Sequence, residues 1–426
     1  MIRSFPSNIS LWDKSAEETK NTSDAAIDVK TDVAIVGGGF TGLSLALHLS
    51  EAGVAAHVFE SEEIGFGGSG RNVGLVNPGI WLPPNDVRKL LGEKRGQKFL
   101  DLFGTAPEYV FNLIERFQIR AETTQAGTIH AAHAPAGMIE LKGRHASWKA
   151  MGAPVELLSR EEVAAKTGTK SFFGGLLDNR AGTINPMGYA RGLARASRAA
   201  GARISTGTRV TSLSKDGNYW RLHLESGETA LADRVILATN AYSDEIWPGL
   251  SDIITPVHYF QIATEPLGEK SKDVLPEGHG LWDTAKVMFS LRRDTFGRII
   301  LGSMGKVIGG EGGLTLIWAQ RTLRRLYPQL ENVMWEPAWH GKIGMTPDHL
   351  PRIFNPAHNL YALLGYNGRG ITTGTVLGRA MANYLVSKNK SDLPLALSEK
   401  ERDRLRVFKA TLFETAFKAY RLYKTF

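Results

Sequence analysis

The sequence predicts an α/β chain, α+β overall, in which a Rossmann-type dinucleotide-binding domain is interleaved with a domain built on an antiparallel sheet. Three observations predict this class. A strand, a glycine-rich turn, a helix and a second strand follow one another between residues 32 and 60. Apolar and polar residues alternate through 255–305, as in antiparallel strands. A second glycine-rich turn opens a helix near residue 370, so the nucleotide-type segments lie far apart along the chain.

The first unit can be justified element by element. Residues 32–36 read as a short buried strand, and 41–52 read as a helix with apolar residues three and four apart. Gly53 ends that helix, and 55–60 supply the second strand. Two strands joined through a helix in this way are expected to be parallel, with a right-handed crossover.

The rest of the chain alternates between the two kinds of structure. Helices are expected near 87–118, 139–152, 188–200, 314–327 and 371–386, and strands over much of 202–239 and 255–305. Segments 30–84, 186–250 and 338–390 are therefore assigned to the dinucleotide-binding domain. Segments 85–185 and 251–337 are assigned to the substrate domain, with 1–29 as an N-terminal arm and 391–426 as a C-terminal amphipathic helical tail.

Length and composition set outer limits on the function. The chain has 426 residues, more than a single core usually holds, so two domains are expected. Hydrophobic residues make up 42% and charged residues 22%, as in ordinary globular proteins. The net charge of +8 is spread along the chain without a long Lys/Arg block, so we expect no nucleic-acid partner.

The chain contains no cysteine, which excludes disulfides, thiolate nucleophiles, iron–sulfur clusters and cysteine-based zinc sites. We expect no metal site. No apolar signal-type run opens the sequence, and no apolar run is long enough to span a bilayer, so a cytoplasmic protein is expected. Nothing in the sequence specifies the oligomeric state.

The turn Gly37-Gly38-Gly39-Phe40-Thr41-Gly42 fits the pattern G-x-G-x-x-G. Its first glycine permits a tight turn, its second lets a pyrophosphate approach the backbone, and its third lets the helix pack on the strand. The phosphate then lies at the helix N-terminus. Glu60 ends the second strand, where its carboxylate can accept hydrogen bonds from ribose hydroxyls. This unit alone separates neither FAD from NAD nor a cofactor site from a glycine-rich turn of another α/β protein.

Three other stretches favour a flavin. The segment 65–79, GFGGSGRNVGLVNPG, surrounds Arg71 and Asn72 with six glycines, so its backbone is expected to approach a ligand closely. A strand over 234–239 can pass beside a bound dinucleotide, although an ordinary buried strand has the same pattern. The turn at 365–370 opens a helix whose N-terminus can stabilise negative charge on a reduced flavin, or can be a structural cap.

With these motifs the chain resembles the D-amino-acid-oxidase-like superfamily of FAD-dependent amine oxidoreductases. The resemblance is carried by GSGRNVGLVN at 68–77, AGTINPMGY at 181–189, GYNGRG at 365–370 and the Ser10-Leu11-Trp12 segment. Within the superfamily these motifs are most similar to the γ-glutamylputrescine oxidase and bacterial L-pipecolate oxidase groups. The resemblance implies FAD as cofactor and a small-molecule amine or amino acid as substrate.

The resemblance also implies which residues hold FAD. Gly37, Gly39, Phe40, Thr41 and Gly42 should hold the pyrophosphate, and Glu60 with Ser61 the adenosine ribose. Val210 should hold the adenine through its backbone. Gly68, Ser69, Arg71, Asn72 and Val73 should lie beside the ribityl chain and the ring. Thr239, Asn240, Gly341, Arg369, Gly370, Ile371, Thr372 and Thr373 should line the dinucleotide and the isoalloxazine.

Two departures from the family pattern matter. Some relatives tether the flavin through a histidine near the second glycine cluster, where this chain has Asn72, and others use a cysteine. The resemblance therefore implies non-covalent FAD. Sarcosine-oxidase-like relatives bind the substrate carboxylate through a lysine that Thr372 replaces here. Arg180, Arg292 and Arg352 are the remaining candidates for a carboxylate clamp, although surface or ion-pair roles are more usual for such residues.

Three residues are candidates for a part in the chemistry. Tyr259 and His340 could face the substrate, although a buried histidine is more often a hydrogen-bonded structural residue. Lys306 resembles the lysine that promotes oxygen attack in some relatives, and a solvated surface lysine has the same pattern. No acid–base pair is required, because the flavin accepts the hydride equivalent.

The C-terminal tail has helical spacing of apolar residues and, over 399–426, eight basic and four acidic residues. Such a helix either packs on its own protein or lies peripherally on the inner membrane.

The sequence thus predicts FAD-dependent oxidation of an amine C–N bond to an imine, with a secondary or cyclic amino acid such as L-pipecolate as substrate. Oxygen, yielding peroxide, or a respiratory carrier would accept the electrons. The alternatives are a γ-glutamylputrescine-type primary amine oxidase, and an NAD-dependent dehydrogenase or non-catalytic dinucleotide-binding protein.

Overall fold

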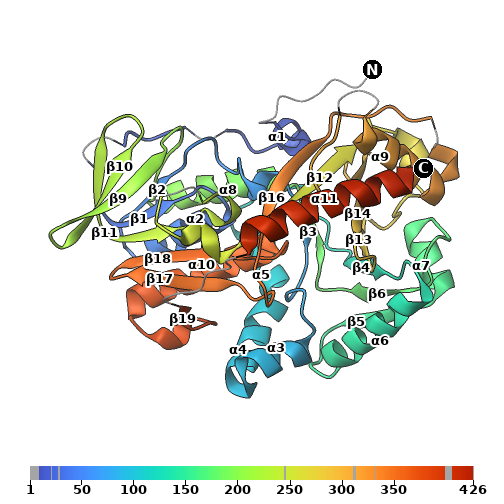
Figure 1. Cartoon of the computed structure of the whole chain (residues 1–426), viewed down its shortest axis with the longest axis horizontal. Coiled ribbons are helices and arrows are strands. Elements are labelled where there is room, and N and C mark those ends of the chain that lie inside the picture. The colour runs from blue at the N-terminus through green and yellow to red at the C-terminus, as the bar shows by residue number, and fades with distance from the viewer. Residues whose placement is uncertain are drawn as a thin grey trace.

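Two sheets lie side by side and share the helices and loops between them (Figure 1). The computed structural model describes residues 9–20, 22–26, 29–243, 246–309, 313–330, 332–398 and 405–425. One sheet has nine strands and the other has eight, and a short two-stranded ribbon joins β3 (Leu75–Val76) to β7 (Gly182–Thr183). The fold class predicted from the sequence is confirmed.

The nine-stranded sheet carries the nucleotide-type unit at its centre. Its main path runs in the order β19-β17-β18-β11-β1-β2-β8, and β10 and β9 extend from β11. β1 pairs in parallel with both β11 and β2, as the glycine motif predicts. The strands are β1 (Val29–Val36), β2 (Ala56–Phe59), β8 (Arg203–Ser205), β9 (Val210–Asp216), β10 (Tyr219–Leu224), β11 (Thr229–Leu237), β17 (Arg352–Ala357), β18 (Leu360–Leu364) and β19 (Leu397–Ser398).

Three helices cover one face of this sheet: α2 (Phe40–Glu51), α8 (Pro186–Ala199) and α10 (Gly370–Ser387). α2 and α10 pack closely because glycines line their contact. A Cβ at Gly374 would lie 2.8 Å from the Thr41 hydroxyl, and one at Gly378 would lie 2.6 Å from the Thr41 carbonyl oxygen. This close packing brings the N-termini of both helices to the same end of the sheet.

The eight-stranded sheet has the order β16-β12-β15-β14-β13-β4-β6-β5 and is antiparallel except for the parallel pair β4–β13. β16, which lies inside the predicted dinucleotide-binding segment 338–390, pairs with β12 and so belongs to this second sheet. The other assignments of segments to domains stay a prediction. The strands are β4 (Thr128–Ala131), β5 (Val155–Leu158), β6 (Gly175–Asp178), β12 (Thr255–Ala263), β13 (Gly280–Asp283), β14 (Phe289–Arg293), β15 (Ile299–Met304) and β16 (Trp339–Met345).

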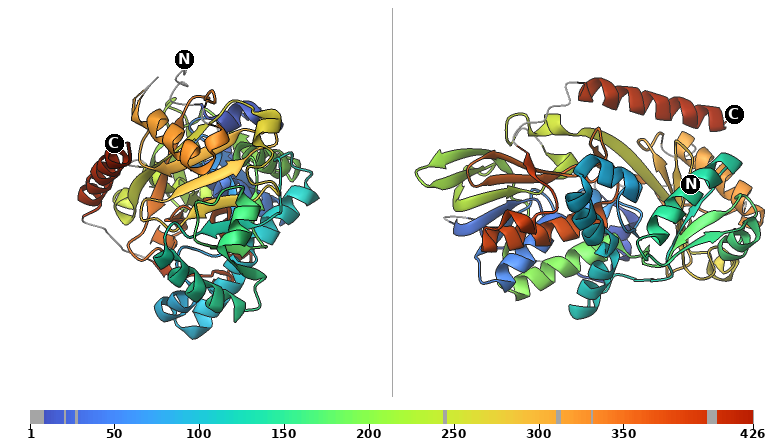
Figure 2. Two further views of the ribbon diagram at one scale, coloured as in Figure 1. Left: turned by 90° about the vertical axis from the view of Figure 1, so that its right-hand side faces the viewer. Right: turned by 90° about the horizontal axis from the view of Figure 1, so that it is seen from below.

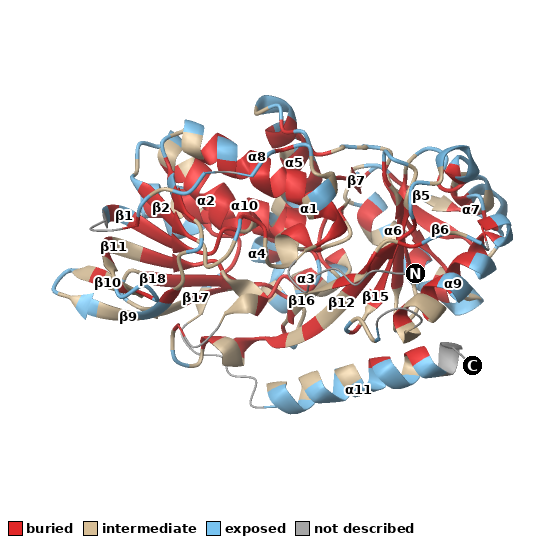
Figure 3. Ribbon diagram, turned by 90° about the horizontal axis from the view of Figure 1, so that it is seen from above, coloured by how far each residue is buried: buried red, intermediate tan, exposed pale blue. Residues whose placement is uncertain are grey.

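Helices also cover the second sheet. α7 (Arg160–Thr167) and α9 (Leu314–Leu326) contribute to its apolar core, and α6 (Pro135–Lys149) packs on β5 and β6. Figure 3 shows buried residues gathered where α2, α8 and α10 face the nine-stranded sheet, whereas β9 at its end is mostly exposed or intermediate. The long helix predicted near 87–118 is instead three, α3 (Pro84–Leu91), α4 (Glu93–Gly104) and α5 (Ala106–Arg116). Gly92, with φ +76°, separates the first two, a backbone conformation that a helix cannot continue through.

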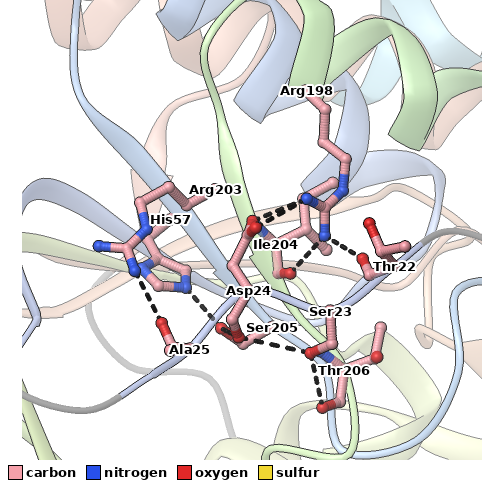
Figure 4. Close-up of polar contacts among 10 residues, drawn as sticks. All are labelled: Thr22, Ser23, Asp24, Ala25, His57, Arg198, Arg203, Ile204, Ser205 and Thr206. Carbon is pink, nitrogen blue, oxygen red and sulfur yellow. Dashed lines mark hydrogen bonds and ion pairs between the residues drawn. The ribbon is translucent and has the colours of Figure 1, made fainter.

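The N-terminal arm closes the edge of the nine-stranded sheet at β8 (Figure 4). The Asp24 carboxylate accepts hydrogen bonds from Arg198 and from the Ile204 amide, and Arg203 donates to the Ala25 carbonyl. His57 beneath it is fully buried, and burial lowers the pKa of its imidazole to about 4, so the ring is neutral. An edge covered in this way offers no free strand for another chain to join.

The C-terminal helix α11 (Arg406–Thr425) lies along the outside of the molecule (Figure 2). It contacts β12 and α9 through its buried residues Phe417 and Arg421. The predicted tail begins within a short 3-10 helix (Lys390–Asp392), passes through β19 and, after residues 399–404, which lie outside the described ranges, continues as this helix. Within the part of the chain that the structure describes, no helix is both long and apolar enough to cross a membrane.

Replacing Gly42 by alanine should destabilise the protein, because the added Cβ would overlap the backbone carbonyl of Gly37 at the turn. We expect a loss of about 2–3 kcal/mol in the free energy of unfolding, measured by denaturant titration. Gly143→Ala is the matched control. It lies exposed in α6 with nothing within 4 Å of the new Cβ, so alanine should stabilise by about 0.5–1 kcal/mol. Equal effects of the two substitutions would contradict the packing role of Gly42.

Candidate functional site

A cavity of about 600 Å³ runs from the N-terminus of α2 to the face of the eight-stranded sheet. This size is typical of a ligand or cofactor site. Most residues predicted to bind the cofactor line it. They are Gly37, Gly39, Phe40, Thr41, Glu60, Ser61, Gly68, Ser69, Arg71, Asn72, Val73, Val210, Thr239, Asn240, Gly341, Arg369, Gly370 and Ile371.

One end of the cavity is the glycine turn between β1 and α2. Gly37 has φ +113°, and a Cβ there would lie 2.9 Å from the carbonyl oxygen of Ala238, so only glycine fits. Gly39 is the N-cap residue of α2, and it lines the cavity together with Phe40 and Thr41. The Glu60 carboxylate accepts hydrogen bonds from the Gly38 amide at 2.6 Å and the Glu62 amide at 3.0 Å. Backbone amides and a fixed acceptor thus meet at this end, as a pyrophosphate and a ribose require.

The glycine-rich stretch 65–79 forms the side of the cavity. The Asn72 side chain donates to the Gly68 and Ser69 carbonyls and accepts from the Gly74 amide at 2.8 Å, so its amide folds the loop. The Ser69 hydroxyl accepts a hydrogen bond from the Phe40 amide at 3.1 Å. The loop is therefore tied both to itself and to the start of α2.

Side chains behind the loop bind its outward-facing carbonyl groups. The Trp12 indole donates to the Asn72 carbonyl at 2.8 Å, and the Ser10 hydroxyl donates to Gly70 at 2.9 Å. The Trp339 indole donates to the Arg71 carbonyl at 3.1 Å and meets Trp12 edge-on. The Ser10-Leu11-Trp12 segment, which the sequence offered only as a family mark, thus has a physical role in bracing the loop.

Arg71 joins the loop to the second sheet. Its Nε donates to the Phe66 carbonyl at 2.6 Å, and its guanidinium donates to the His340 carbonyl at 3.3 Å and stacks on Phe66. The side chain is 8% exposed, and burial lowers the pKa of its guanidinium. Arg71 therefore fixes the spacing between the loop and β16, both of which line the cavity.

The loops before α10 form the adjoining wall. The Asn240 side-chain oxygen accepts a hydrogen bond from the Gly365 amide at 2.9 Å, and the Asn367 oxygen accepts one from the Thr346 amide at 2.8 Å. Thr372 and Thr373, predicted to line the isoalloxazine, are buried in α10 and do not reach the cavity. The Thr372 hydroxyl donates instead to the Asn77 carbonyl. Gly42 also lies off the cavity, against Gly37.

The far wall comes from the eight-stranded sheet and was largely missed from the sequence. Tyr259 lines it, as expected, and its hydroxyl donates to Ser290 at 3.0 Å. Burial raises the pKa of this phenol, so it stays protonated. Strand alternation from Tyr259 could have found Gln261, because residues two apart share a face. The other unpredicted residues of this wall are Trp282, Lys286, Met288, Ser290 and Met304, with Trp81 beside them.

His340 and Lys306 do not face the cavity, and the roles predicted for them are corrected here. His340 pairs in register with Phe260, which lies on the sheet face opposite Tyr259. Its ring lies 5.5 Å from His258, whose Nδ1 is 2.8 Å from the Glu414 carboxylate of α11. Burial, with His258 next in effect, lowers the pKa of His340 to about 4.

Lys306 is exposed, and its carbonyl accepts a hydrogen bond from Arg421 of α11. The predicted carboxylate clamps are also elsewhere. Arg180 pairs with Asp178 at 2.6 Å and Arg352 with Asp348 at 2.9 Å. Arg292 donates to the Ile184 carbonyl beneath the loop and stacks on Trp12. Among the described residues, no group of acidic and histidine side chains could hold a metal ion.

The chain matches a known protein family and is similar in sequence to several known proteins. The family model described as FAD dependent oxidoreductase matches residues 32–384. The chain is 29% identical over 362 residues to gamma-glutamylputrescine oxidoreductase of Escherichia coli, covering 84% of each chain. It is 28% identical over 362 residues to a probable oxidoreductase, OrdL, of Rhizobium meliloti, again covering 84% of each.

Solved structures share the fold. Glycine oxidase from Geobacillus kaustophilus aligns with a TM-score of 0.71 and 20% identity, over 88% of this chain and 100% of that one. L-Amino acid deaminase from Proteus myxofaciens aligns with a TM-score of 0.72 and 14% identity, over 89% and 95% of the two chains.

Trp12→Phe should loosen the loop that lines the cavity, because the Asn72 carbonyl loses its indole donor while the core stays filled. We expect cofactor affinity to fall about tenfold, equivalent to about 1.4 kcal/mol, as measured by titrating the cofactor-free protein with FAD. Trp220→Phe is the control, since that buried indole donates to the His358 carbonyl away from the cavity. If both variants bind FAD like the parent protein, Trp12 does not brace the site.

Proposed function

The chain belongs to the family of FAD-dependent oxidoreductases, and we propose that it oxidises the C–N bond of a secondary or cyclic amino acid to an imine, with L-pipecolate as the substrate. FAD, when bound, accepts a hydride equivalent from the carbon beside a neutral amine. The observation that carries the proposal is one continuous cavity, which joins the glycine turn of β1–α2 to the polar wall around Tyr259 and Ser290.

The residues present fit FAD. Gly37 and Gly39 line the cavity at the start of α2, where a pyrophosphate would bind, and Glu60 places acceptors for ribose hydroxyls. Arg71, Gly341 and the first residues of α10 would line the isoalloxazine. We propose that the cofactor is non-covalent, because the chain has no cysteine and because Asn72, whose amide is engaged within the loop, offers no nucleophile.

The charges along the cavity favour an amino acid over a polyamine. The only lining carboxylates among the described residues are Glu60 and Glu62, both at the dinucleotide end. The wall around Tyr259 carries cations but no carboxylate that could bind a second ammonium group. A γ-glutamylputrescine-type amine is the second candidate, supported by the 29% identity to the enzyme of that name.

Tyr259 and Ser290 would position the substrate. The Tyr259 phenol is protonated and donates to Ser290, so the Ser290 hydroxyl proton is free to reach a substrate acceptor. The apolar lining of Met288, Met304 and Trp282 would exclude water from the reacting carbon.

The purified protein should be yellow, and anaerobic addition of L-pipecolate should bleach the flavin absorbance. Acid precipitation should leave the flavin in the supernatant, because no covalent link holds it. Bleaching by γ-glutamylputrescine but not by L-pipecolate would replace the proposed substrate with the second candidate. A colourless protein that binds no added FAD would reject both. Reoxidation by air, with peroxide formed, would identify oxygen as the acceptor, and its absence would favour a respiratory carrier.

We also propose that α11 makes peripheral contact with a membrane. It exposes Val407, Phe408 and Leu412, each more than half exposed, and Lys418 is exposed as well. A helix with an apolar outer face and a basic flank suits an anionic bilayer surface. Contact through α11 would place the enzyme beside a membrane-bound electron acceptor.

Membrane contact predicts that the protein co-sediments with vesicles containing phosphatidylglycerol, and that the double variant Phe408→Glu, Leu412→Glu does not. The acidic side chains would meet apolar lipid and anionic headgroups. Ile139→Glu is the control, because Ile139 is 76% exposed on α6. Equal sedimentation of the double variant and the parent protein would exclude α11 as the contact.

A further inference from the structure

Resting on the proposed function, we infer that Arg369 is the receptor for the substrate carboxylate and that the substrate carries this carboxylate next to the oxidised carbon. Arg369 was expected to line the flavin. Its surroundings instead point the guanidinium toward the substrate wall.

The Arg369 guanidinium lies between two indole rings. Its central carbon is 5.0 Å from the ring centroid of Trp81 and 4.8 Å from that of Trp282. Both tryptophans are held in place: the Trp81 indole donates to the Asn367 carbonyl, and Trp282 stacks on His130 with ring centroids 3.4 Å apart. The two rings restrict the guanidinium in position and leave its edge as the route to a ligand in the cavity.

Apart from the two indole rings, the Arg369 guanidinium has no hydrogen-bonding or ion-pairing partner within the described residues. Its side chain is 8% exposed, makes no hydrogen bond or ion pair there, and has a fully buried Nε without an acceptor. The other deeply buried arginines differ, since Arg292 and Arg421 donate to backbone carbonyls. A buried cation without an anion is unfavourable by several kcal/mol, so a ligand that supplies the anion would bind here with a large gain.

The electric field around Arg369 also favours an anion. Burial, and then the nearby Arg144 guanidinium, lower the pKa of Arg369 to about 9, so the group remains a cation at neutral pH. Arg144 donates to the Trp81 carbonyl and does not line the cavity, so it adds positive charge from behind. Asp178, the carboxylate whose charge acts to raise the pKa of Arg369, is already paired with Arg180 at 2.6 Å.

The position of Arg369 indicates which atom of the substrate it binds. Trp282 pairs in register with Ser290, which accepts the Tyr259 hydrogen bond, so Arg369, Trp282, Ser290 and Tyr259 form one continuous wall. Arg369 also directly precedes Gly370 and Ile371, which would line the flavin ring. A carboxylate bound in two hydrogen bonds to the guanidinium would therefore lie close to the reacting carbon, as in an α-amino acid, and not at the far end of a long amine.

The test compares Arg369→Gln and Arg369→Lys with Arg352→Gln, a control whose guanidinium pairs with Asp348 outside the cavity. Binding of cyclohexanecarboxylate, which has no amine to oxidise, is followed by the change in the flavin spectrum. We expect Arg369→Gln to weaken this binding about 100-fold and Arg352→Gln to leave it unchanged. The lysine variant keeps the positive charge but cannot form two parallel hydrogen bonds. Its affinity for cyclohexanecarboxylate should therefore lie between those of the two glutamine variants.

Turnover separates recognition from chemistry. For Arg369→Gln, kcat/KM on L-pipecolate should fall at least about 100-fold, while kcat/KM on piperidine, which lacks the carboxylate, should stay within about threefold. Unchanged carboxylate binding in both Arg369 variants would overturn the inference. So would a loss of FAD affinity alone, which would return Arg369 to the cofactor.

A failure of the proposed function would give a different result from a failure of this inference. If no amino acid bleaches the flavin, but cyclohexanecarboxylate still perturbs its spectrum in an Arg369-dependent way, the anion receptor stands and the proposed reaction does not. If Arg369→Gln does not fold, the lysine variant carries the test, with weakened carboxylate binding and intact FAD binding as the supporting result.

Discussion

The site depends on a backbone loop that lies between two sheets without filling the space between them. The loop of residues 65–79 packs closely on the protein behind it: a Cβ at Gly70 would lie 2.2 Å from Met187, and one at Gly74 would lie 2.1 Å from the Ile184 carbonyl oxygen. Its carbonyl groups find donors on the same side, in the hydroxyl of Ser10 and the indoles of Trp12 and Trp339. The N-terminal arm and β16 are thus tied to the cavity wall by the same set of hydrogen bonds.

Because side chains alternate along a strand, the two faces of the second sheet have different neighbours. On β12, Tyr259 and Gln261 face the cavity, whereas His258 and Phe260 face α9 and α11. His340 follows its partner Phe260 to the outer face. One face of β12 and β16 therefore contributes to the substrate wall, and the other face lies toward the C-terminal helix α11. α11 also reaches the cavity wall through β15, because Arg421 donates to the carbonyl of Met304, which lines the cavity.

Local patterns carried much of the prediction. The strand–glycine turn–helix unit, Glu60 and the loop 65–79 were found because neighbouring residues determine their backbone and their burial. The predicted helix near 87–118 was wrong as a single element, since Gly92 turns the chain with φ +76°. His340 was misplaced because the face of a strand depends on its register with a partner distant in sequence. Lys306 was misplaced because it lies beyond the end of β15, beside α11. Tyr259 lines the cavity, as was expected from the sequence. Ser290 and Trp282 were missed, because only the pairing of β13 with β14 makes them neighbours.

The arginines show where sequence reasoning reaches its limit. Arg180 and Arg352 pair with carboxylates only two and four residues away, Asp178 and Asp348, so the sequence itself contained their partners. Arg292 and Arg369 depend on tertiary neighbours instead: a backbone carbonyl for Arg292, and two indole rings for Arg369. Indole faces hold a cation without neutralising it. Glu60 and Glu62 line the dinucleotide end of the cavity, and the uncompensated cation Arg369 lines the substrate end. The two ends therefore carry opposite charges. On the proposed function, an amino acid with a neutral amine would bind with its carboxylate at Arg369, away from Glu60 and Glu62.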